Sequence, residues 1–382
     1  MGRRVLRSAA LGIAALSLWV VAPALSTTAY VPAAVDFSQP LPAAKALPAP
    51  ASKSAPGKHV AHPGEGPVSH RTGAVDAPQR FDAVGLAGEL RPVEIRTRDH
   101  GGEWSRWFAI AAGDPLFVVG GADEAQLRTR GWVPSGTLHY VNVSGTTTAA
   151  QTALTSIRGA VSSAVISAGN LLAPAAKAAA RPDFISRGAW GANDEQDGCI
   201  PRKRPDYGVV KAVVIHHTVT SNSYTHSQAK GIVLAICRFH RNANKWNDIG
   251  YQALTDRFGR TYEGRKGGVE EPVVGAQAQG YNAQTAGIAA IGTHSSQRVS
   301  KKTFNALAKY TAWKLERHGH DALASTTLTS KGGEVNRYPR GRKIRVPRVI
   351  PHRQLDITAC PGDGLAGRLP GLRKAAQRRI DN

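Results

Sequence analysis

Apolar and polar residues alternate in short runs between Arg80 and Ser144, and turn residues such as Asp99 and Gly101 separate the runs. Alternation with a period of two is typical of strands that bury one face. The runs that follow this pattern are Val93 to Arg98, Trp104 to Ala112, Leu116 to Val119 and Leu138 to Val143. We therefore predict a small antiparallel β domain over residues 80–145, of unknown role.

The pattern changes to a mixed one between Pro182 and the end of the chain. A continuous apolar run at 209–215 predicts a central strand covered on both faces, and 227–241 places apolar residues on one face of a helix. Ser300 can cap a second helix that ends before Gly319. Further elements are expected at 250–254 and 260–263 (a hairpin), 287–291, 346–350 and 364–379 (a helix interrupted near Pro370). Interleaved strands and helices predict an α/β or α+β domain, with a central mixed β-sheet flanked by helices, over residues 182–382.

Two segments lack these patterns. Residues 27–79 are dominated by Ala, Pro, Ser and Gly, which bury too little apolar surface to fold, and we predict an extended linker there. Residues 146–181 are rich in Ala, Thr and Ser and have weak helical periodicity. A helix is one interpretation of this second segment, but we interpret it as another linker.

The N-terminus has the basic, apolar and small-residue order of a secretory signal peptide, which we place at residues 1–26. An uncleaved N-terminal anchor is the alternative, and Arg3 with Arg4 weakly suggests twin-arginine export. No second apolar stretch is long enough to span a bilayer, so we expect a secreted or wall-associated protein with no stable membrane span.

The formal net charge of +22 indicates attraction to anionic polymers, and outside a cell these are wall glycopolymers or acidic lipids. A basic surface that only aids solubility is the other interpretation. Aromatic and basic residues are not interleaved as in proteins that bind single strands, so we expect no nucleic-acid partner. We expect a monomer. Trp104, Trp107 and Trp132 can form a sugar-stacking platform, although aromatics buried in a sheet are the more common arrangement.

Three residues stand out as soft-metal ligands: His216 after the apolar strand, and His352 with Cys360 in the C-terminal region. Two imidazoles and one thiolate fill three positions of a tetrahedral zinc ion and leave one open, as in catalytic sites. Cys199 and Cys237 then remain as a disulfide pair in an oxidising compartment. A disulfide from Cys360 to one of them, with no metal site, is the alternative. Spacing alone is weak support, because the chain has 13 histidines.

Several motifs occur in order along the C-terminal half and strengthen this interpretation. They are Ile185-Ser-Arg-Gly-Ala-Trp-Gly-Ala, Val214-Ile-His-His-Thr, Asp248-Ile-Gly-Tyr, Thr261-Tyr-Glu-Gly-Arg, Val274-Gly-Ala-Gln and Thr358-Ala-Cys-Pro-Gly. Together they resemble the peptidoglycan recognition proteins and the related zinc N-acetylmuramoyl-L-alanine amidases of the phage lysozyme type. The resemblance covers most of residues 182–382, and the N-terminal part matches the small β domain of some secreted bacterial members more loosely.

The resemblance implies the same zinc ligands, His216, His352 and Cys360, and implies an active enzyme, because members that only recognise peptidoglycan typically lack the cysteine. It assigns Tyr251 to the oxyanion and Thr358 to the orientation of water or substrate. It also maps substrate contacts onto His240 and Asn282. For His240 a structural role on the apolar helix is the strong alternative, and we expect His217 to be structural.

The sequence departs from the family at two places. Where many relatives have Gly-His-Arg-Asp, this chain has Pro351-His-Arg-Gln354, so a carboxylate that could orient a zinc ligand is missing. The region after Tyr262-Glu-Gly-Arg is insertion-like, so the sequence does not specify whether stems with diaminopimelate or with lysine are preferred.

The sequence therefore predicts an exported zinc enzyme that hydrolyses the amide between N-acetylmuramic acid and L-alanine in peptidoglycan. A non-catalytic recognition module that binds peptidoglycan is the second hypothesis, and an adhesin for anionic polymers is the third.

Overall fold

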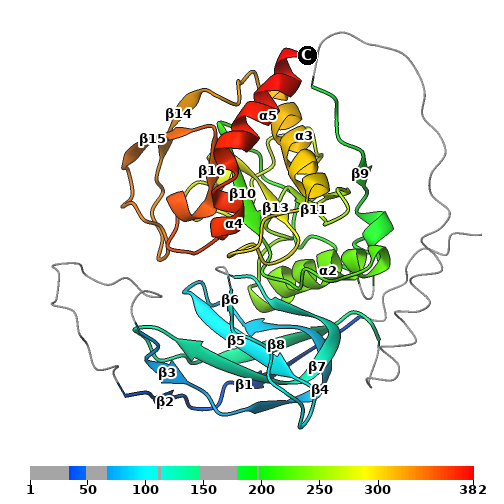
Figure 1. Ribbon diagram of the computed structural model, residues 1–382, viewed down its shortest axis with the longest axis vertical. Helices are drawn as coiled ribbons and strands as arrows, with labels where there is room; N and C mark the ends of the chain where they lie inside the picture. The colour runs from blue at the N-terminus through cyan, green and yellow to red at the C-terminus, as the bar shows by residue number, and fades with distance from the viewer. Residues whose placement is uncertain (1–33, 49–66, 111–112, 146–178, 196–197) are drawn as a thin grey trace, which may run out of the picture.

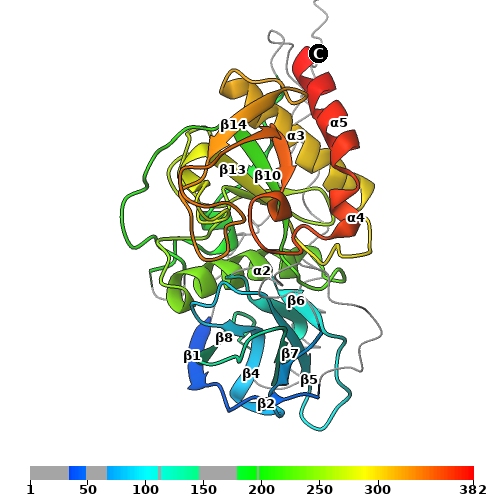
Figure 2. The same ribbon diagram turned by 90° about the vertical axis from the view of Figure 1, so that its left-hand side faces the viewer.

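The computed structural model describes residues 34–48, 67–110, 113–145, 179–195 and 198–382. An N-terminal β domain and a C-terminal α/β domain lie against each other, with helix α2 (His226–Arg238) between the two sheets (Figures 1 and 2). The signal peptide predicted at 1–26 and the second linker up to residue 178 lie outside the described residues. Within the part of the chain that is described, no helix is long and apolar enough to cross a membrane.

The β domain is an eight-stranded sheet with the strand order β1-β8-β4-β7-β3-β2, to which β5 and β6 add beside β7. All its strand pairs are antiparallel, as predicted. Its interior contains Phe81, Leu127 and Tyr140. The strands are β1 (Val35–Pro40), β2 (Lys45–Ala46), β3 (His70–Arg71), β4 (Val75–Leu86), β5 (Val93–Arg98), β6 (Phe108–Ile110), β7 (Leu116–Thr129) and β8 (Thr137–Asn142).

The start of this domain lies earlier than Arg80, which corrects the predicted boundary. Strands β1, β2, β3 and the beginning of β4 occupy described parts of the segment that was expected to be linker. β1 pairs along its whole length with β8 and forms one end of the strand order, and β2 forms the other. End strands leave one row of backbone groups unpaired, so they tolerate the proline and small residues of this segment.

Arginines lie over the three tryptophans of the β domain. Arg96 lies 4.7 Å from the ring centroid of Trp104 and 4.6 Å from that of Trp107, and Arg91 lies 4.0 Å from that of Trp132. Cation–π contacts of this kind hold the indole faces against guanidinium groups. The described arrangement therefore favours the structural interpretation of these aromatics over a sugar-stacking platform.

The C-terminal domain contains a six-stranded sheet with the order β16-β10-β13-β11-β12-β9. The interior strand β10, next to the edge strand β16, is buried at every position and pairs in parallel with β13 and β16, as the continuous apolar run predicts. The strands are β9 (Phe184–Ile185), β10 (Ala212–His217), β11 (Ala253–Thr255), β12 (Thr261–Glu263), β13 (Thr285–Ala290) and β16 (Val349–Pro351), and β14 (Ser325–Thr329) pairs separately with β15 (Lys343–Pro347).

Helices cover both faces of this sheet. Ala289 of β13 packs in the apolar cluster that contains α2, whereas its neighbours Ile288 and Ala290 pack in the cluster of α3 (Lys301–Arg317) and α5 (Leu369–Asp381). Ser300 caps α3 at the predicted position by accepting from the backbone N–H of Thr303. The C-terminal helical region is interrupted before Pro370, between α4 (Asp363–Ala366) and α5.

A lysine is buried on the inner side of α3. Lys314 is 1% exposed, and its Nζ donates to the carbonyl oxygens of Val269 and Glu271, both at 2.8 Å. Burial lowers its pKa to about 8, although the nearby Glu271 opposes the shift and Arg317 reinforces it. Folding therefore places a positive charge where it is poorly solvated.

The two domains share an apolar core. Ala83, Phe117 and Val141 of the β domain belong to one buried cluster with Ile236 and Phe239, which lie at the end of α2 and in the following π-helical turn η3 (Phe239–Ala243). An ion pair between Arg238 and Asp36, 2.7 Å long with side chains only 9% and 13% exposed, lies beside this core. Burial of apolar side chains from both partners indicates a stable docking of the domains.

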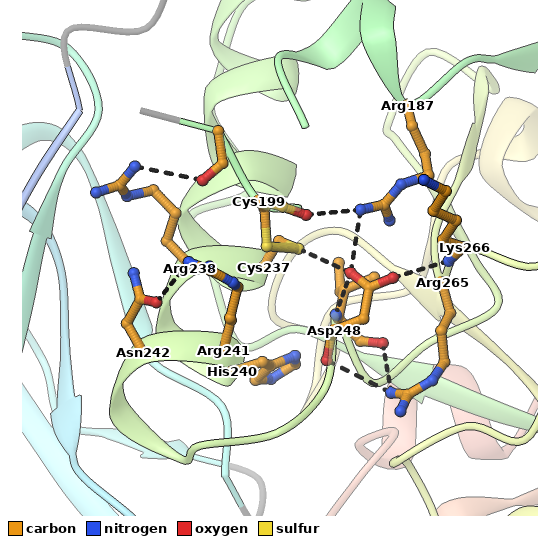
Figure 3. Close-up of a disulfide and its surroundings, with 12 residues drawn as sticks. Arg187, Cys199, Cys237, Arg238, His240, Arg241, Asn242, Asp248, Arg265 and Lys266 are labelled. Atoms are coloured by element: carbon orange, nitrogen blue, oxygen red, sulfur yellow. Dashed lines mark hydrogen bonds and ion pairs between the residues drawn. A yellow bond between two sulfur atoms is a disulfide. The ribbon is translucent and has the colours of Figure 1, made fainter. Parts of the chain in front are cut away.

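The predicted cysteine pair forms a disulfide that connects α2 to the loop after the short helix η2 (Gly188–Trp190) (Figure 3). Cys199 and Cys237 have their Cα atoms 6.1 Å apart. Beside them the buried Asp248 pairs with Arg187 at 3.1 Å and accepts from the backbone N–H of Lys266 at 2.8 Å (Figure 3). The disulfide and this network fix the start of the Asp-Ile-Gly-Tyr segment.

Candidate metal centre and active site

Adjacent parallel strands bring His216 and His352 together. His216 lies near the end of β10, and His352 opens the 3-10 turn η5 (His352–Gln354) directly after β16, whose Pro351 pairs with Ile215. The carboxyl ends of parallel strands meet at one edge of a sheet, where binding sites commonly form. The two imidazole centroids are accordingly 4.4 Å apart.

Cys360 completes this group of potential ligands. Its Sγ lies 3.7 Å from Nδ1 of His216, and the ligand atoms of His216, His352 and Cys360 all lie within 4.8 Å of one another. The three side chains are almost fully buried, and Cys360 is the free cysteine of the chain. The structure therefore brings together the three residues that the sequence predicts as ligands.

Each imidazole is oriented by an oxygen on its outer side. Nε2 of His216 lies 2.6 Å from Oε1 of Gln277, and Nε2 of His352 lies 2.9 Å from Oδ2 of Asp356. The Gln277 amide keeps its oxygen towards His216 because its NH2 donates to the hydroxyl oxygen of Thr285. The hydroxyl hydrogen of Thr285 is in turn donated to the carbonyl oxygen of Tyr281. Both histidines therefore carry their proton on Nε2 and present the Nδ1 lone pair to the cysteine side.

The donor set fits a zinc ion. Nδ1 of His352 is buried and has no hydrogen-bond partner among the described residues, which is a costly state that a metal would relieve. Zinc bonds to nitrogen and sulfur at a tetrahedral angle would separate the two ligand atoms by about 3.6 Å. The observed 3.7 Å between His216 and Cys360 agrees with this value.

Burial sets the charge state of the ligands. Burial, and secondarily His352, lower the pKa of His216 well below its usual range, so the imidazole is neutral and able to bind a metal. Burial also raises the pKa of the Cys360 thiol, whose sulfur accepts from the backbone N–H of His217 at 3.4 Å. A bound cation would reverse the shift of the cysteine, because it stabilises the thiolate.

The expected gap beside His352 is filled by a different residue, which corrects the sequence prediction. Gln354 takes the place of the family's aspartate, but the carboxylate of Asp356 bonds the same imidazole from the following turn. Asp356 is 1% exposed and also accepts from the backbone N–H of Gln279 at 2.8 Å. His352 therefore has the carboxylate support that is typical of metal-binding histidines.

Tyr251 lies beside the ligand group, with its ring centroid 5.1 Å from that of His216. Its hydroxyl donates to Oδ2 of Asp114, a residue of the β domain, at 2.6 Å. Burial, and then the charge of Asp114, raise the pKa of Tyr251 well above its usual range, so the phenol keeps its proton.

The other sequence-predicted residues lie near the site but are occupied by internal bonds. His240 is 1% exposed and bonds Asp114, which agrees with the structural alternative for this residue. Asn282 accepts from the backbone N–H groups of Gln277 and Ala278, at 2.7 and 2.9 Å. Thr358 is half-buried and accepts from the backbone N–H of Cys360 at 3.1 Å.

A neighbour of the ligand group, His217, is buried. Its Nδ1 accepts from the backbone N–H of His294 at 3.1 Å. Burial lowers the pKa of His217 to about 3, so the ring stays neutral, in keeping with the structural role expected for it.

A cavity of about 150 Å³ opens between the ligand group and the β domain. Tyr251, Gln277 and His352 line it from the C-terminal domain, and Leu90 and Asp114 line it from the β domain. A second hollow of about 530 Å³, bordered by Gly280, Gln284 and Lys331, shares Asn282 with the first.

Three functional positions were missed by sequence reasoning. Gln277 belongs to a motif that was recognised but given no role, and Asp356 lies only four residues after His352. Asp114 had no signal in the sequence, because it lies in the other domain.

The chain is similar to known proteins of one family. The family model described as N-acetylmuramoyl-L-alanine amidase matches residues 206–363. A peptidoglycan recognition protein of Trichoplusia ni is 36% identical over 175 residues, which cover 44% of this chain and 79% of that protein. An N-acetylmuramoyl-L-alanine amidase of Mus musculus is 26% identical over 187 residues, or 48% of this chain, and the match spans only 29% of that longer protein.

Among solved structures, Drosophila PGRP-LB is 23% identical with a TM-score of 0.38, over 50% of this chain and 93% of that one. An endolysin amidase of Clostridium intestinale is 20% identical with a TM-score of 0.33, over 46% of this chain and 88% of that one. Because the Trichoplusia protein is matched over most of its own length and the amidase family model spans the candidate metal centre, this chain belongs to the family of peptidoglycan recognition proteins and N-acetylmuramoyl-L-alanine amidases.

Proposed function

We propose that the protein is a zinc-dependent N-acetylmuramoyl-L-alanine amidase, which hydrolyses the amide between N-acetylmuramic acid and L-alanine in peptidoglycan. The observation that carries the proposal is that His216, His352 and Cys360 lie together. Both imidazoles are held by hydrogen bonds to side chains that are not ligands, Gln277 and Asp356. The mouse relative named as this amidase and a Drosophila relative solved with tracheal cytotoxin support a muropeptide as the substrate. The disulfide and the signal-like N-terminus support action outside the cell.

Zinc held by the three ligands would supply an activated water and polarise the scissile carbonyl. The chain's own residues prepare this chemistry. Gln277 and Asp356 hold the two imidazoles in one tautomer. The protonated phenol of Tyr251, beside His216, is the donor for the oxyanion that develops on the carbonyl.

Three further residues act on the walls of the site in this proposal. Asn282 holds the backbone at Gln277 and Ala278 that lines the cavity, and it borders both hollows. His240 supports the site from beneath its surface. Thr358, whose oxygen accepts from the backbone of Cys360, orients the ligand loop, and its O–H positions water or substrate.

Digestion of purified peptidoglycan by the zinc-loaded full chain tests the proposal. We expect new L-alanine amino termini on intact stem peptides, and we expect Cys360→Ala to lose both zinc and hydrolysis. Ser296→Ala, at an exposed position of a nearby loop, is the matched control and should behave like the wild type. New reducing sugar ends would instead indicate a glycosidase.

Zinc content and binding to the wall, measured on the same preparation, separate the amidase from the two other hypotheses. Stoichiometric zinc and binding to the wall without any hydrolysis would indicate a recognition module. Binding that survives loss of zinc and is abolished by salt would indicate an adhesin for anionic polymers, because salt screens interactions between exposed charges.

A further inference from the structure

A loop of the β domain reaches into the candidate active site. It runs between β6 and β7, and its described part begins at Gly113. Asp114 of this loop is 5% exposed and lines the cavity beside His352. A carboxylate is rarely buried without partners, so the groups that face it define its role.

Among the described residues, two side chains donate to Asp114. Its Oδ1 lies 2.8 Å from Nε2 of His240, and its Oδ2 lies 2.6 Å from the hydroxyl oxygen of Tyr251. Nδ1 of His240 accepts from the backbone N–H of Gly250 at 3.1 Å, so the ring proton must be on Nε2 and points to Asp114. A phenol has a single hydrogen, and that of Tyr251 is also directed to Asp114.

Besides His240 and Tyr251, Asn244 of the C-terminal domain also holds this loop in place. Nδ2 of Asn244 donates to the carbonyl oxygen of Gly113 at 2.6 Å, and its Oδ1 accepts from the backbone N–H of Gly88 at 3.1 Å. Gly88 precedes Leu90, the second residue of the β domain that lines the cavity. Two loops of the β domain are thus fastened beside a cavity of about 150 Å³, to whose lining they contribute Leu90 and Asp114. Sites for ligands of drug size occupy about 300–1,000 Å³.

We propose that Asp114 is a built-in competitor for the substrate: its carboxylate occupies the position at which the substrate carbonyl would accept a hydrogen bond from Tyr251. The inference rests on the proposed function, which gives Tyr251 to that carbonyl. An oxyanion donor must lie within hydrogen-bond distance of the reacting oxygen, and this place is taken by Oδ2 of Asp114.

The competition is local to the loop. The apolar core shared around Phe117 and Phe239 keeps the β domain docked, so substrate has to displace the Asp114 carboxylate rather than the whole domain. When the competent state of a site is only partly populated, the apparent affinity falls by the same fraction. The β domain therefore sets the affinity of the site.

The test compares Asp114→Ala with the wild type in the zinc-loaded full chain. Binding of muramyl dipeptide is followed by calorimetry, with mass spectrometry to verify that the ligand stays intact, and kcat and KM are measured on soluble wall fragments. A hydrogen bond to a charged group is worth about ten-fold or more in an equilibrium, so we expect at least ten-fold tighter binding and a lower KM with kcat unchanged.

Three variants complete the design. Asn244→Ala removes the bonds to the backbone of Gly113 and Gly88 without changing Asp114, and it should tighten binding in the same direction. Asp114→Asn keeps the shape and one acceptor, should give an intermediate effect, and carries the test if Asp114→Ala does not fold. Asp76→Ala removes a β-domain carboxylate whose side chain is 73% exposed, and it should leave binding unchanged.

Unchanged or weaker binding in the folded Asp114 variants would overturn the inference, as would a fall in kcat, which would make Asp114 part of the catalytic machinery. Absence of binding in every variant would also overturn it. The two proposals fail separately. Tighter binding by Asp114→Ala without hydrolysis by any form would refute the amidase function but support the competition by Asp114. Hydrolysis by the wild type with unaltered affinity in the variants would support the amidase function and refute the competition.

Discussion

Replacement of Asp356 by asparagine tests how the metal centre is held. Oδ2 of Asp356 accepts from His352 at 2.9 Å and from the backbone N–H of Gln279 at 2.8 Å. Asparagine has the same shape, and its amide oxygen can keep both of these bonds while its NH2 replaces Oδ1, which has no hydrogen-bond partner among the described residues. It lacks the negative charge that raises the basicity of the imidazole as a zinc ligand. We therefore expect Asp356→Asn to weaken zinc binding.

The magnitude follows from the role of such outer partners. Loss of a group that orients a metal-binding histidine typically costs about 10- to 100-fold in metal affinity, or about 1.4 to 2.8 kcal/mol. Competition for zinc with a chromophoric chelator measures this directly, and thermal unfolding without metal separates it from any effect on the fold. Gln354→Asp is the matched control, because it restores the family's carboxylate at a position that this chain does not use. Its zinc affinity should stay within about two-fold of the wild type.

Two results would refute the reasoning. Wild-type zinc affinity in Asp356→Asn would show that the carboxylate does not support His352. A more than ten-fold gain in Gln354→Asp would show that the family position still controls the ligand, and that Asp356 is an incidental neighbour.

Three further predictions concern stability, each measured by urea unfolding. The pKa of Lys314 is about 8 in the folded chain and about 10.4 when unfolded. Between these values the unfolded chain binds more protons, so wild-type stability should rise with pH relative to Lys314→Met, by up to about 3 kcal/mol, with no relative slope below pH 7. Replacing both Cys199 and Cys237 by alanine opens a loop with a sequence separation of 38 and should cost about 4 kcal/mol. Phe239→Ala should cost about 3–5 kcal/mol, because the ring is fully buried between the domains; a loss below 1 kcal/mol would contradict the shared core.

Sequence patterns within a short segment predicted the elements that depend on residues of that same segment. The helix after Ser300 begins at its expected cap, and the apolar run at 209–215 lies largely in the interior strand that carries His216. Strand β1 could not be predicted in this way. Its pairing with β8 joins residues about a hundred positions apart, and its Asp36 and Pro40 have low strand propensity. Only the presence of β8 as a partner makes an edge strand of this segment.

In the candidate site, the ligands could likewise be predicted from the sequence, whereas the residues that support them could not. Ligand type and motif order were enough to predict His216, His352 and Cys360, because metal chemistry restricts the choice of side chains. The support around them depends on how backbone turns aim side chains. Gln354 occupies the family position, yet the 3-10 turn that begins at His352 directs the imidazole towards Asp356 instead.

Asp114 shows why a boundary drawn from composition does not enclose the site. It lies 126 residues from His240 and 137 residues from Tyr251, in a domain whose own sequence carries no catalytic motif. A fragment of residues 182–382 would lose this carboxylate and would expose Phe239 to water. Its activity would therefore report on an altered pocket and a disturbed core together. Point variants in the full chain avoid this ambiguity, since Asp114→Ala changes the pocket and leaves the shared core intact.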